Sequence, residues 1–430
     1  MTLSLNATHA NGATEYNVHN LMGHMQSQAT RGFLESSSSP MTGKRPFLVS
    51  SGSFSGSGAN AGHPISPINR SFDDMKNATA GVMNMNMFGV PFSGPDVCGT
   101  SGTADEELCA RWIQTSAFYP LARQFTQDAG IEPFNMQEPT NMDMAKASLL
   151  ERLRNSRQLY TCLFEAQDHG ETCFDPLLFH FPTDEMAAKH TEQSFVFANA
   201  LMVTPVVEAG SETVTAYVPA GTFINMKDYT IVTSTGEKLD IAVQPDVAIN
   251  HLMPGKIVTK QMGDFLTTTD LKDNLFTLVA NRDEFGHAEG TLYVDDGVTL
   301  DQAYDYMEFQ LSANSFKKWV KGESSNTKNL DSLIITNAKD LANVDFVCAR
   351  ATDGYAKTDL KATASGDEGA EIVTITSVDG SPIDLGAIKD IHWGSSATDL
   401  NLCDIASQYY KVSGDPIDLT GPTATTTLTS

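Results

Sequence analysis

The side chains most able to do chemistry by themselves are six cysteines, and their spacing does not suit a metal site. They contain none of the Cys-Xaa-Xaa-Cys pairs that structural zinc sites use. The sequence leaves disulfide bonds and buried free thiols as alternatives, and we expect a disulfide for at least one pair. No EF-hand or similar calcium loop is present either. We therefore expect no bound metal and no cofactor.

Three Asn-Xaa-Ser/Thr triplets are the second chemical signal, because they are acceptor sites for N-linked glycans in secreted proteins. They begin at Asn6, Asn69 and Asn77, although such triplets also arise by chance in a long chain. The first ten residues, MTLSLNATHA, have neither the basic nor the apolar region of a signal peptide. With the cysteines, the triplets favour an extracellular or secretory-pathway location.

The overall composition limits the classes of partner. Lys plus Arg number 28 and Asp plus Glu number 53, which gives a net charge of -25. A field of this sign repels phosphate backbones and anionic headgroups, so we expect neither nucleic-acid nor membrane-surface binding. No apolar run reaches the roughly 20 residues that a membrane span needs. With 430 residues, the chain is long enough for two or three domains.

The spacing of apolar residues predicts an α/β part followed by an all-β part. Up to about residue 185, helical patterns alternate with short apolar runs, which is typical of a parallel sheet with crossover helices. From about residue 194 the apolar residues alternate with period two, which is typical of β-sandwiches. In the first part we expect helices over 73–87, 106–123 and 144–166, and strands over 45–49 and 89–92.

One segment carries a specific family resemblance. It reads Gly94-Pro-Asp-Val-Cys-Gly99, then Glu107-Leu-Cys-Ala-Arg-Trp112, then Ala117-Phe-Tyr-Pro120. This segment resembles the signature of glycoside hydrolase family 31, the family of α-glucosidases. Further motifs on either side look like the same family and come in the same order. They include Ala61-Gly-His63, Gly170-Glu-Thr172 and Glu289-Gly-Thr-Leu-Tyr-Val-Asp-Asp-Gly297. The likeness covers about residues 13 to 315.

The resemblance implies a fold that is α/β plus all-β: the C-terminal part of a (β/α)8 TIM barrel followed by two β-sandwich domains. The domains implied are the barrel part over 1–185, a proximal sandwich over 186–260, a distal sandwich over 261–415 and a polar tail over 416–430. The family's first barrel strands and its aspartate nucleophile would lie upstream of Met1. Because half a barrel exposes strand edges, we expect a second chain or self-association to complete it.

The resemblance also indicates that the catalytic machinery is lost. Retaining glycoside hydrolysis needs two carboxyl groups about 5 to 5.5 Å apart, one as nucleophile and one as acid/base. The family's acid/base position corresponds to Pro67, which has no proton to give. Asp73 and Asp74 align instead with acidic residues at a helix start, where carboxylates favour the positive end of the dipole. We expect no catalytic residue in this chain.

The family's other sugar contacts are altered as well. Its arginine and tryptophan anchors correspond to Ser51 and Pro64, a second arginine corresponds to Asp175, and a histidine corresponds to Gln167, with His169 nearby. Reversing a buried charge requires a rebuilt pocket. His63 and Asp96 remain in their motifs, and we expect packing and organisation of backbone N–H groups as their roles. The degenerate pocket is therefore expected at Ser51, His63, Pro64, Asp96, Gln167 and Asp175.

For the cysteines, the resemblance pairs Cys98 with Cys109 in a disulfide that closes a short loop. Such a bridge stabilises a fold by about 2 to 3 kcal/mol. The remaining assignments are a second bridge between Cys348 and Cys403, and buried thiols at Cys162 and Cys173.

Three functions are consistent with these observations. The first is a catalytically inactive α-glucosidase relative reused as an extracellular structural or binding scaffold, and the clustered losses favour it. The second is a part of an α-glucosidase that hydrolyses O-glycosyl bonds with a nucleophile from an upstream segment or a partner chain. The third is a lectin-like protein that binds a glycan through Asp96 and Trp112.

Overall fold

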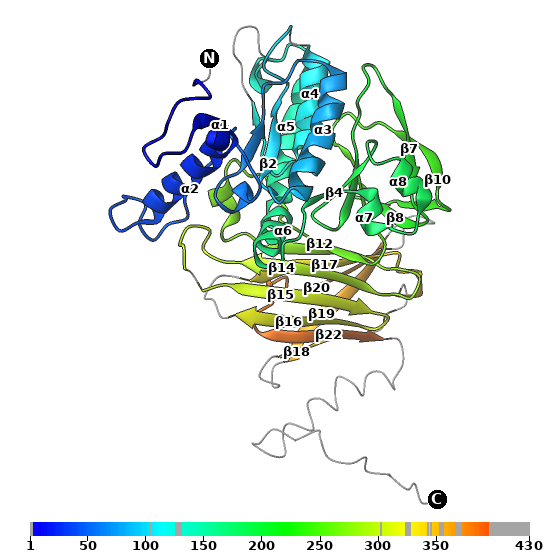
Figure 1. The fold of residues 1–430 in the computed structure, drawn as a ribbon. Helices are drawn as coiled ribbons and strands as arrows, with labels where there is room; N and C mark the ends of the chain where they lie inside the picture. The colour runs from blue at the N-terminus through cyan, green and yellow to red at the C-terminus, as the bar shows by residue number, and fades with distance from the viewer. Residues whose placement is uncertain are drawn as a thin grey trace, which may run out of the picture.

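The computed structural model describes residues 3–103, 105–124, 131–301, 303–322, 328–341, 344, 346–351, 357–365 and 372–394. The helices belong mainly to the first half of the chain, and they lie on one side of a broad layer of strands from the second half (Figure 1). The predicted order of an α/β part followed by an all-β part is confirmed. The polar tail over 416–430 lies outside the described residues. In the described part, no helix is both long enough and apolar enough to cross a membrane.

The helices begin and end at residues with recognisable capping roles. The Ser71 hydroxyl accepts a hydrogen bond from the Asp74 N–H at 3.0 Å, and the Asp105 carboxylate accepts one from the Leu108 N–H at 2.9 Å. Gly170 ends the last long helix in the left-handed region, at φ 79°. The α-helices are α1 (Glu15–Val18), α2 (Met22–Glu35), α3 (Phe72–Met87), α4 (Glu106–Ser116), α5 (Pro139–Arg154), α6 (Ser156–His169), α7 (Leu177–His180) and α8 (Glu185–Lys189). Short 3-10 turns are η1 (His19–Leu21), η2 (Ser57–Ala59), η3 (Pro133–Asn135), η4 (Thr268–Leu271) and η5 (Lys339–Leu341).

A small parallel sheet represents the barrel. It has three strands in the order β1 (His63–Ile65), β2 (Ser93–Val97) and β3 (Arg123–Gln124). An isolated parallel bridge from Val49 to Gly62 continues it on the β1 side. Helices α3 and α4 connect successive strands and bury Met75, Trp112 and other apolar side chains against them. The carboxyl ends of these strands are where a barrel enzyme would carry its active site.

A second sheet of six strands follows, and its first strand comes directly after α6. The strands lie in the order β4 (Phe174–Pro176), β5 (Phe195–Phe197), β6 (Leu201–Thr204), β11 (Ile249–Leu252), β8 (Gly221–Asn225) and β9 (Ile231–Ser234). A separate antiparallel pair joins β7 (Thr213–Val218) to β10 (Glu237–Ala242). Phe195 and Phe197 on β5 pack into the same core as the barrel helices, so the two parts share one hydrophobic interior.

The largest sheet has eleven strands, and ten of them form a closed ring. The order runs β13-β12-β14-β15-β16-β22-β18-β19-β20-β17, and β13 pairs with β17 to close it, while β21 pairs with β17. The ring encloses its own core, which includes Leu292, Phe309 and Ile335. The strands are β12 (Lys256–Lys260), β13 (Phe276–Asn281), β14 (Ala288–Val294), β15 (Asp305–Ser312), β16 (Ser315–Gly322), β17 (Asn329–Thr336), β18 (Phe346–Ala351), β19 (Lys357–Ser365), β20 (Ile372–Ser377), β21 (Ile383–Asp384) and β22 (Ile388–Gly394).

Some predicted element boundaries were wrong. The helix expected over 106–123 ends at Ser116, and the one expected over 144–166 is two helices that meet at Asn155. At that junction the Asn155 side chain donates to the Glu151 carbonyl at 3.1 Å and to its carboxylate at 2.7 Å, which favours a turn. The strand expected over 45–49 is reduced to the single bridge at Val49, and the one expected over 89–92 begins at Ser93.

Candidate functional site

The carboxyl end of β1 presents no ionisable side chain at the predicted acid/base position. Pro67 lies two residues beyond β1 and is exposed. The two aspartates that could have replaced the acid/base, Asp73 and Asp74, lie at the start of α3 instead. The Asp74 carboxylate accepts a hydrogen bond from the Ser71 hydroxyl at 2.6 Å, and Asp73 is exposed in the first turn of α3. As predicted, both acidic residues stand at a helix start.

Asp96, near the end of β2, is fully buried and bound by a cation. The Arg123 Nε of the neighbouring strand donates to its Oδ1 at 2.6 Å. Its Oδ2 has no hydrogen-bond partner in the described part of the chain. We expected Asp96 to organise backbone N–H groups. The ion pair is a different contact, in which the Asp96 side chain on β2 binds the Arg123 side chain on β3.

The residues on the β1 side of the predicted pocket differ in their exposure to solvent. Ser51 is exposed in the loop before β1, whereas Pro64 is buried within β1. The His63 Nδ1 lies 3.1 Å from the Ser50 carbonyl, and burial lowers the pKa of this imidazole although that contact opposes the shift. His63 is thus a half-buried, neutral side chain at neutral pH, in keeping with a packing role.

The remaining two predicted pocket positions lie on α6 and β4. Gln167 is exposed in the last turn of α6, as is His169. Asp175 is buried on β4, and its Oδ2 lies 3.0 Å from the His180 Nε2. Within the described residues, no hydrogen bond or ion pair connects Asp175 with Asp96. The reversed charge at this position therefore has a partner of its own in His180.

These side chains do not form a pair of free carboxyl groups at the ends of the barrel strands. Asp96 and Asp175 are each engaged by a basic side chain, and Pro67 has no acidic group. Trp112, the aromatic residue considered for glycan binding, is fully buried in the core. The described residues contain no cluster of three or more His, Cys, Asp or Glu suited to a metal ion.

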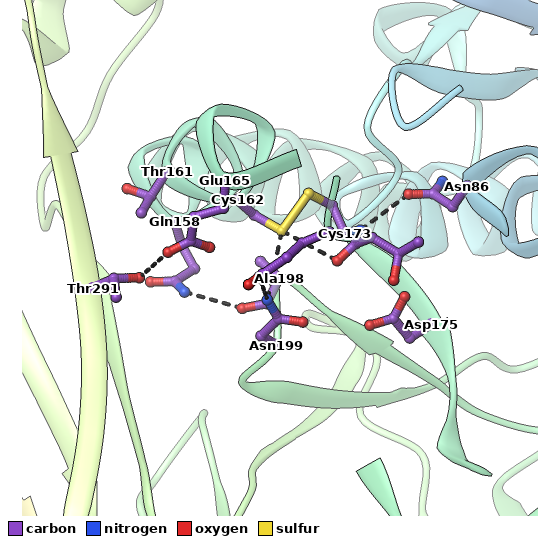
Figure 2. Close-up of a disulfide and its surroundings, with 12 residues drawn as sticks. Asn86, Gln158, Thr161, Cys162, Glu165, Cys173, Asp175, Ala198, Asn199 and Thr291 are labelled. Atoms are coloured by element: carbon purple, nitrogen blue, oxygen red, sulfur yellow. Dashed lines mark hydrogen bonds between the residues drawn. A yellow bond between two sulfur atoms is a disulfide. The ribbon is translucent and has the colours of Figure 1, made fainter. Parts of the chain in front are cut away.

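The disulfides confirm one assignment and correct another. Cys98 and Cys109 are bonded as predicted, with 4.6 Å between their Cα atoms. The buried thiols expected at Cys162 and Cys173 were wrong, because these two are also bonded, with a Cα distance of 5.7 Å (Figure 2). The turn at Gly170 brings the end of α6 beside β4. Cys348 is disulfide-bonded too, while Cys403, its predicted partner, lies outside the described residues.

The three predicted glycosylation positions are all at the surface. Asn6, Asn69 and Asn77 have exposed side chains. The Asn77 triplet is on α3, however, and its Thr79 hydroxyl is buried and lies 2.9 Å from the Tyr119 hydroxyl. The buried Thr79 makes Asn77 the less accessible acceptor of the three, and glycosylation stays a prediction.

A feature that the sequence analysis missed is a buried polar stripe on α6. Gln158, Thr161 and Glu165 share one helix face with Cys162, and all are buried. The Gln158 Oε1 accepts from the Thr259 N–H at 3.0 Å, and the Thr161 Oγ1 accepts from the Tyr293 N–H at 3.0 Å. This stripe docks the helix on β12 and β14. Hydrophobic periodicity cannot reveal such an interface, because the residues that form it are polar.

Glu165 is the acidic member of this stripe, and it lines a cavity of about 530 Å³. Its Oε1 accepts hydrogen bonds from the Thr291 hydroxyl at 2.6 Å and the Tyr306 hydroxyl at 2.8 Å. Burial raises the pKa of the Glu165 carboxyl above its usual value, while the two hydrogen bonds act in the opposite direction. The only sequence signal for this site was the motif ending at Gly297, which contains Thr291.

Comparison with known proteins gives two family matches. The model for the glycosyl hydrolases family 31 TIM-barrel domain matches residues 2–162, and the model for the glycosyl hydrolase family 31 C-terminal domain matches residues 170–258. Together these matches cover more than half of the chain. Both models describe the family that the signature segment resembled.

Individual relatives are longer than this chain. An α-glucosidase of Hordeum vulgare is 33% identical over 294 residues, which is 68% of this chain and 33% of the relative. The lysosomal α-glucosidase of Mus musculus is 33% identical over 308 residues, which is 67% of this chain and 32% of the relative. The chain thus spans about a third of the length of the relatives it matches.

A solved structure, the glucosidase II alpha subunit bound to alpha3-Glc2, has the same fold. It superposes with a TM-score of 0.83 over 91% of this chain and 44% of that one, at 23% sequence identity. This likeness extends the match beyond the residues covered by the family models.

Proposed function

Because the chain belongs to glycoside hydrolase family 31, we propose that it is an α-glucosidase relative that does not cleave glycosidic bonds and acts as an extracellular structural or binding scaffold. The observation that carries this proposal is Pro67 at the carboxyl end of β1. A glycosidase needs a dissociable carboxyl there to protonate the leaving oxygen. A proline cannot supply one.

The surviving acidic residues support the same proposal. Asp96 is bound to Arg123 at 2.6 Å, and Asp74 is part of the helix cap with Ser71. Each carboxylate is thus engaged in a contact within the fold. Neither is free to approach a leaving-group oxygen at the acid/base position.

Hydrolytic activity is the direct test. The purified chain should release no glucose from maltose or from an aryl α-glucoside above the buffer rate, while an active α-glucosidase in the same buffer verifies the assay. Turnover that is abolished by D96N or D74N would contradict the proposal. The variant P67D returns a carboxyl to this exposed position, and it should be inactive as well, because the reaction also needs a nucleophile.

A second candidate is that the chain works as part of an α-glucosidase whose nucleophile comes from an upstream segment or a partner chain. The observation in its favour is a set of apolar side chains exposed along α2: Met22, Met25 and Phe33. Contiguous exposed apolar surface is typical of interaction sites. One of the structural relatives is a glucosidase II complex of a catalytic subunit with the binding domain of a regulatory subunit.

The oligomeric state separates the two candidates. The scaffold proposal allows any state, whereas the second candidate requires association with another chain before any turnover appears. Light scattering should then give a mass above 46.4 kDa for the active species. A monomer without activity in every fraction would exclude self-association as the route to an enzyme.

The secretory-pathway location is also a proposal. It is supported by the described disulfides and by the exposed acceptors Asn6 and Asn69. Expression in a eukaryotic secretory host should give a product whose mass falls on treatment with peptide N-glycosidase. An unchanged mass would argue against glycosylation at these positions.

A further inference from the structure

The cavity beside Glu165 has the form of a ligand site. It lies between α6, the turn at Asn199 and the strands β12, β14, β15 and β16, and its volume is about 530 Å³. Pockets for small ligands are typically about 300 to 1,000 Å³. None of its lining residues belongs to β1, β2 or β3, and it meets the predicted degenerate pocket only through His180, the partner of Asp175.

One wall holds a carboxylate whose second oxygen accepts no described hydrogen bond. The Glu165 side chain belongs to a residue that is 6% exposed, and both of its described hydrogen bonds go to Oε1. Its Oε2 has no hydrogen-bond partner in the described residues. Figure 2 shows the bond to Thr291 on the strand side of the helix. Glu165 lines the cavity, so this oxygen is available to accept a hydrogen bond from a molecule bound there.

The opposite wall provides an aromatic surface. Thr291, Glu308 and Trp319 are direct neighbours across β14, β15 and β16. Side chains opposite each other on adjacent strands lie on the same face of a sheet. Trp319 is 49% exposed, which is unusual for so large an apolar side chain, and the other described tryptophans are buried. An exposed indole in a cavity offers a flat apolar surface and one N–H donor.

The floor of the cavity is built by closely packed backbone. A Cβ atom on Gly290 would lie 2.5 Å from the Ile257 carbonyl oxygen, so only glycine permits this approach of β14 to β12. Beside it, the Lys256 ammonium binds the Glu289 carboxylate at 2.8 Å. The only lysine in the lining is thereby neutralised, the lining His180 faces Asp175, and Glu165, Glu171 and Glu308 leave the cavity with a surplus of carboxylates.

We propose that this cavity binds a neutral saccharide of one or two rings, with a ring face on Trp319 and a hydroxyl donating to the Glu165 Oε2. Sugar hydroxyls donate hydrogen bonds, and carboxylate oxygens accept them. The surplus of carboxylates disfavours phosphorylated or acidic sugars. The absence of a metal-type cluster in the described residues disfavours a bare cation. The proposal does not depend on whether the barrel residues are catalytic.

Isothermal titration calorimetry of the full chain with maltose and with glucose tests the proposal. We expect saturable binding of at least one of them, weakened about tenfold or more in both E165Q and W319A, because each loses a direct ligand contact. Glucose 1-phosphate should bind more weakly than glucose. The matched controls are E237Q, on exposed β10, and F285A, on an exposed loop, and both should bind like the parent chain.

Three results would overturn the proposal. The first is no binding of either sugar by a chain that is folded by circular dichroism. The second is binding with the same dissociation constant in the parent chain and in both cavity variants. The third is binding that is lost in H63A but kept in E165Q and W319A, since this places the sugar at the barrel. Because the W319A change is at an exposed side chain, loss of folding should not obscure the result.

Discussion

Two buried carboxylates, Asp96 and Glu165, differ in the partners they meet. Asp96 faces the Arg123 guanidinium, whereas Glu165 faces two hydroxyl groups and a cavity. For Glu165, burial raises the pKa of the carboxyl and the two hydroxyl donors offset this only in part. The same chemical group therefore links two strands at Asp96 and lines a cavity at Glu165.

The raised pKa of Glu165 predicts a pH-dependent contribution to stability. The folded chain holds this proton to higher pH than the unfolded chain does, so stability is lost as pH rises from the usual Glu value through the folded pKa. The variant E165Q should not show this loss of stability. The melting temperature of E165Q minus that of the parent should therefore increase from pH 4.5 to pH 7. Thermal melts at both pH values measure the difference.

The charged neighbours of Glu165 are Glu171 and His169, and both remain in this variant. The control is E237Q, a substitution at an exposed residue. The difference in melting temperature between E237Q and the parent should not increase from pH 4.5 to pH 7. A pH-independent difference for E165Q would show that Glu165 titrates at its usual value.

A second buried carboxylate network joins the N-terminal segment to the large sheet. The Asp295 side chain is fully buried and accepts bonds from Arg45 at 2.5 Å, from the Tyr160 hydroxyl at 3.0 Å and from the Tyr293 hydroxyl at 2.9 Å. Together with burial, the Asp295 charge raises the pKa of Tyr160 to about 12. This network connects three segments that are far apart in sequence.

Substitution D295N should destabilise the fold by about 2 to 3 kcal/mol, because it leaves the Arg45 cation without its counter-charge. Urea unfolding followed by circular dichroism measures the loss. The control is E35Q, which breaks a partly exposed pair with Arg31 on one helix and should cost about 0.5 kcal/mol or less. Equal effects in the two variants would argue against a special role for Asp295.

At the scale of elements, α6 connects the barrel part with both sheets that follow. Its polar stripe bonds β12 and β14, and Phe164 stacks on Tyr293 with ring centroids 4.0 Å apart. Its middle is covalently joined, through Cys162, to Cys173, the residue that precedes β4. In Figure 1 this helix lies between the other long helices and the layer of strands. Loss of its anchors should therefore weaken the junction of all three parts.

The disulfide that joins α6 to the segment before β4 gives the prediction for the scale of elements. The double variant C162S/C173S should lose about 2 to 3 kcal/mol of unfolding free energy, because the closed loop no longer restricts the unfolded chain. The bridge between Cys98 and Cys109 has the same sequence separation of 11, so C98S/C109S is the matched comparison and should lose a similar amount. Urea titrations with and without a reductant measure both.

A loss much greater for C162S/C173S than for C98S/C109S would indicate that the α6 junction itself has opened. No loss on reduction of the parent chain would contradict the role given to these bridges.

Local signals in the sequence predicted the helices better than the contacts between them. The helix over 73–87 was found within one residue, because its first turn carries Asp73 and Asp74. The break at Asn155 was missed, because the apolar pattern continues across it. The pairing of Cys162 with Cys173 was missed because both occupy positions that are apolar in the family, so nothing local marked them as bonded.

Contacts across long sequence separations were beyond reach for a different reason. Glu165 meets Thr291 across 126 positions and Tyr306 across 141. Periodicity reports which face of an element is buried, but it does not say which distant element covers that face. The family resemblance supplied the candidate barrel residues, and nothing in it marked the cavity on α6.

For the molecule as a whole, the dominant property is its charge. The net charge of -25 is spread over a fold in which many acidic side chains are exposed. Repulsion among like charges destabilises a compact state, and salt reduces it. Isolated surface pairs such as Lys76 with Glu192, at 3.6 Å, contribute little against this background.

The melting temperature should accordingly rise when sodium chloride is increased from about 0.01 M to about 0.15 M, since the screening length falls from about 30 Å to about 8 Å. Differential scanning calorimetry at neutral pH measures the shift. The variant E237Q, which removes one exposed charge, should show a slightly smaller rise. A melting temperature that is flat or falls with salt would mean that attractive pairs outweigh the repulsion.

The closed ring formed by ten strands has a consequence for how the protein opens. A sheet with free ends loses its outer strands first, and its amide protons exchange in a gradient from rim to centre. Here, each strand of the circle is laddered on both sides. Deuterium uptake by the strands of the ring should consequently be slow and nearly even. The earliest exchange should occur between β12 and β14, which share a single register pair.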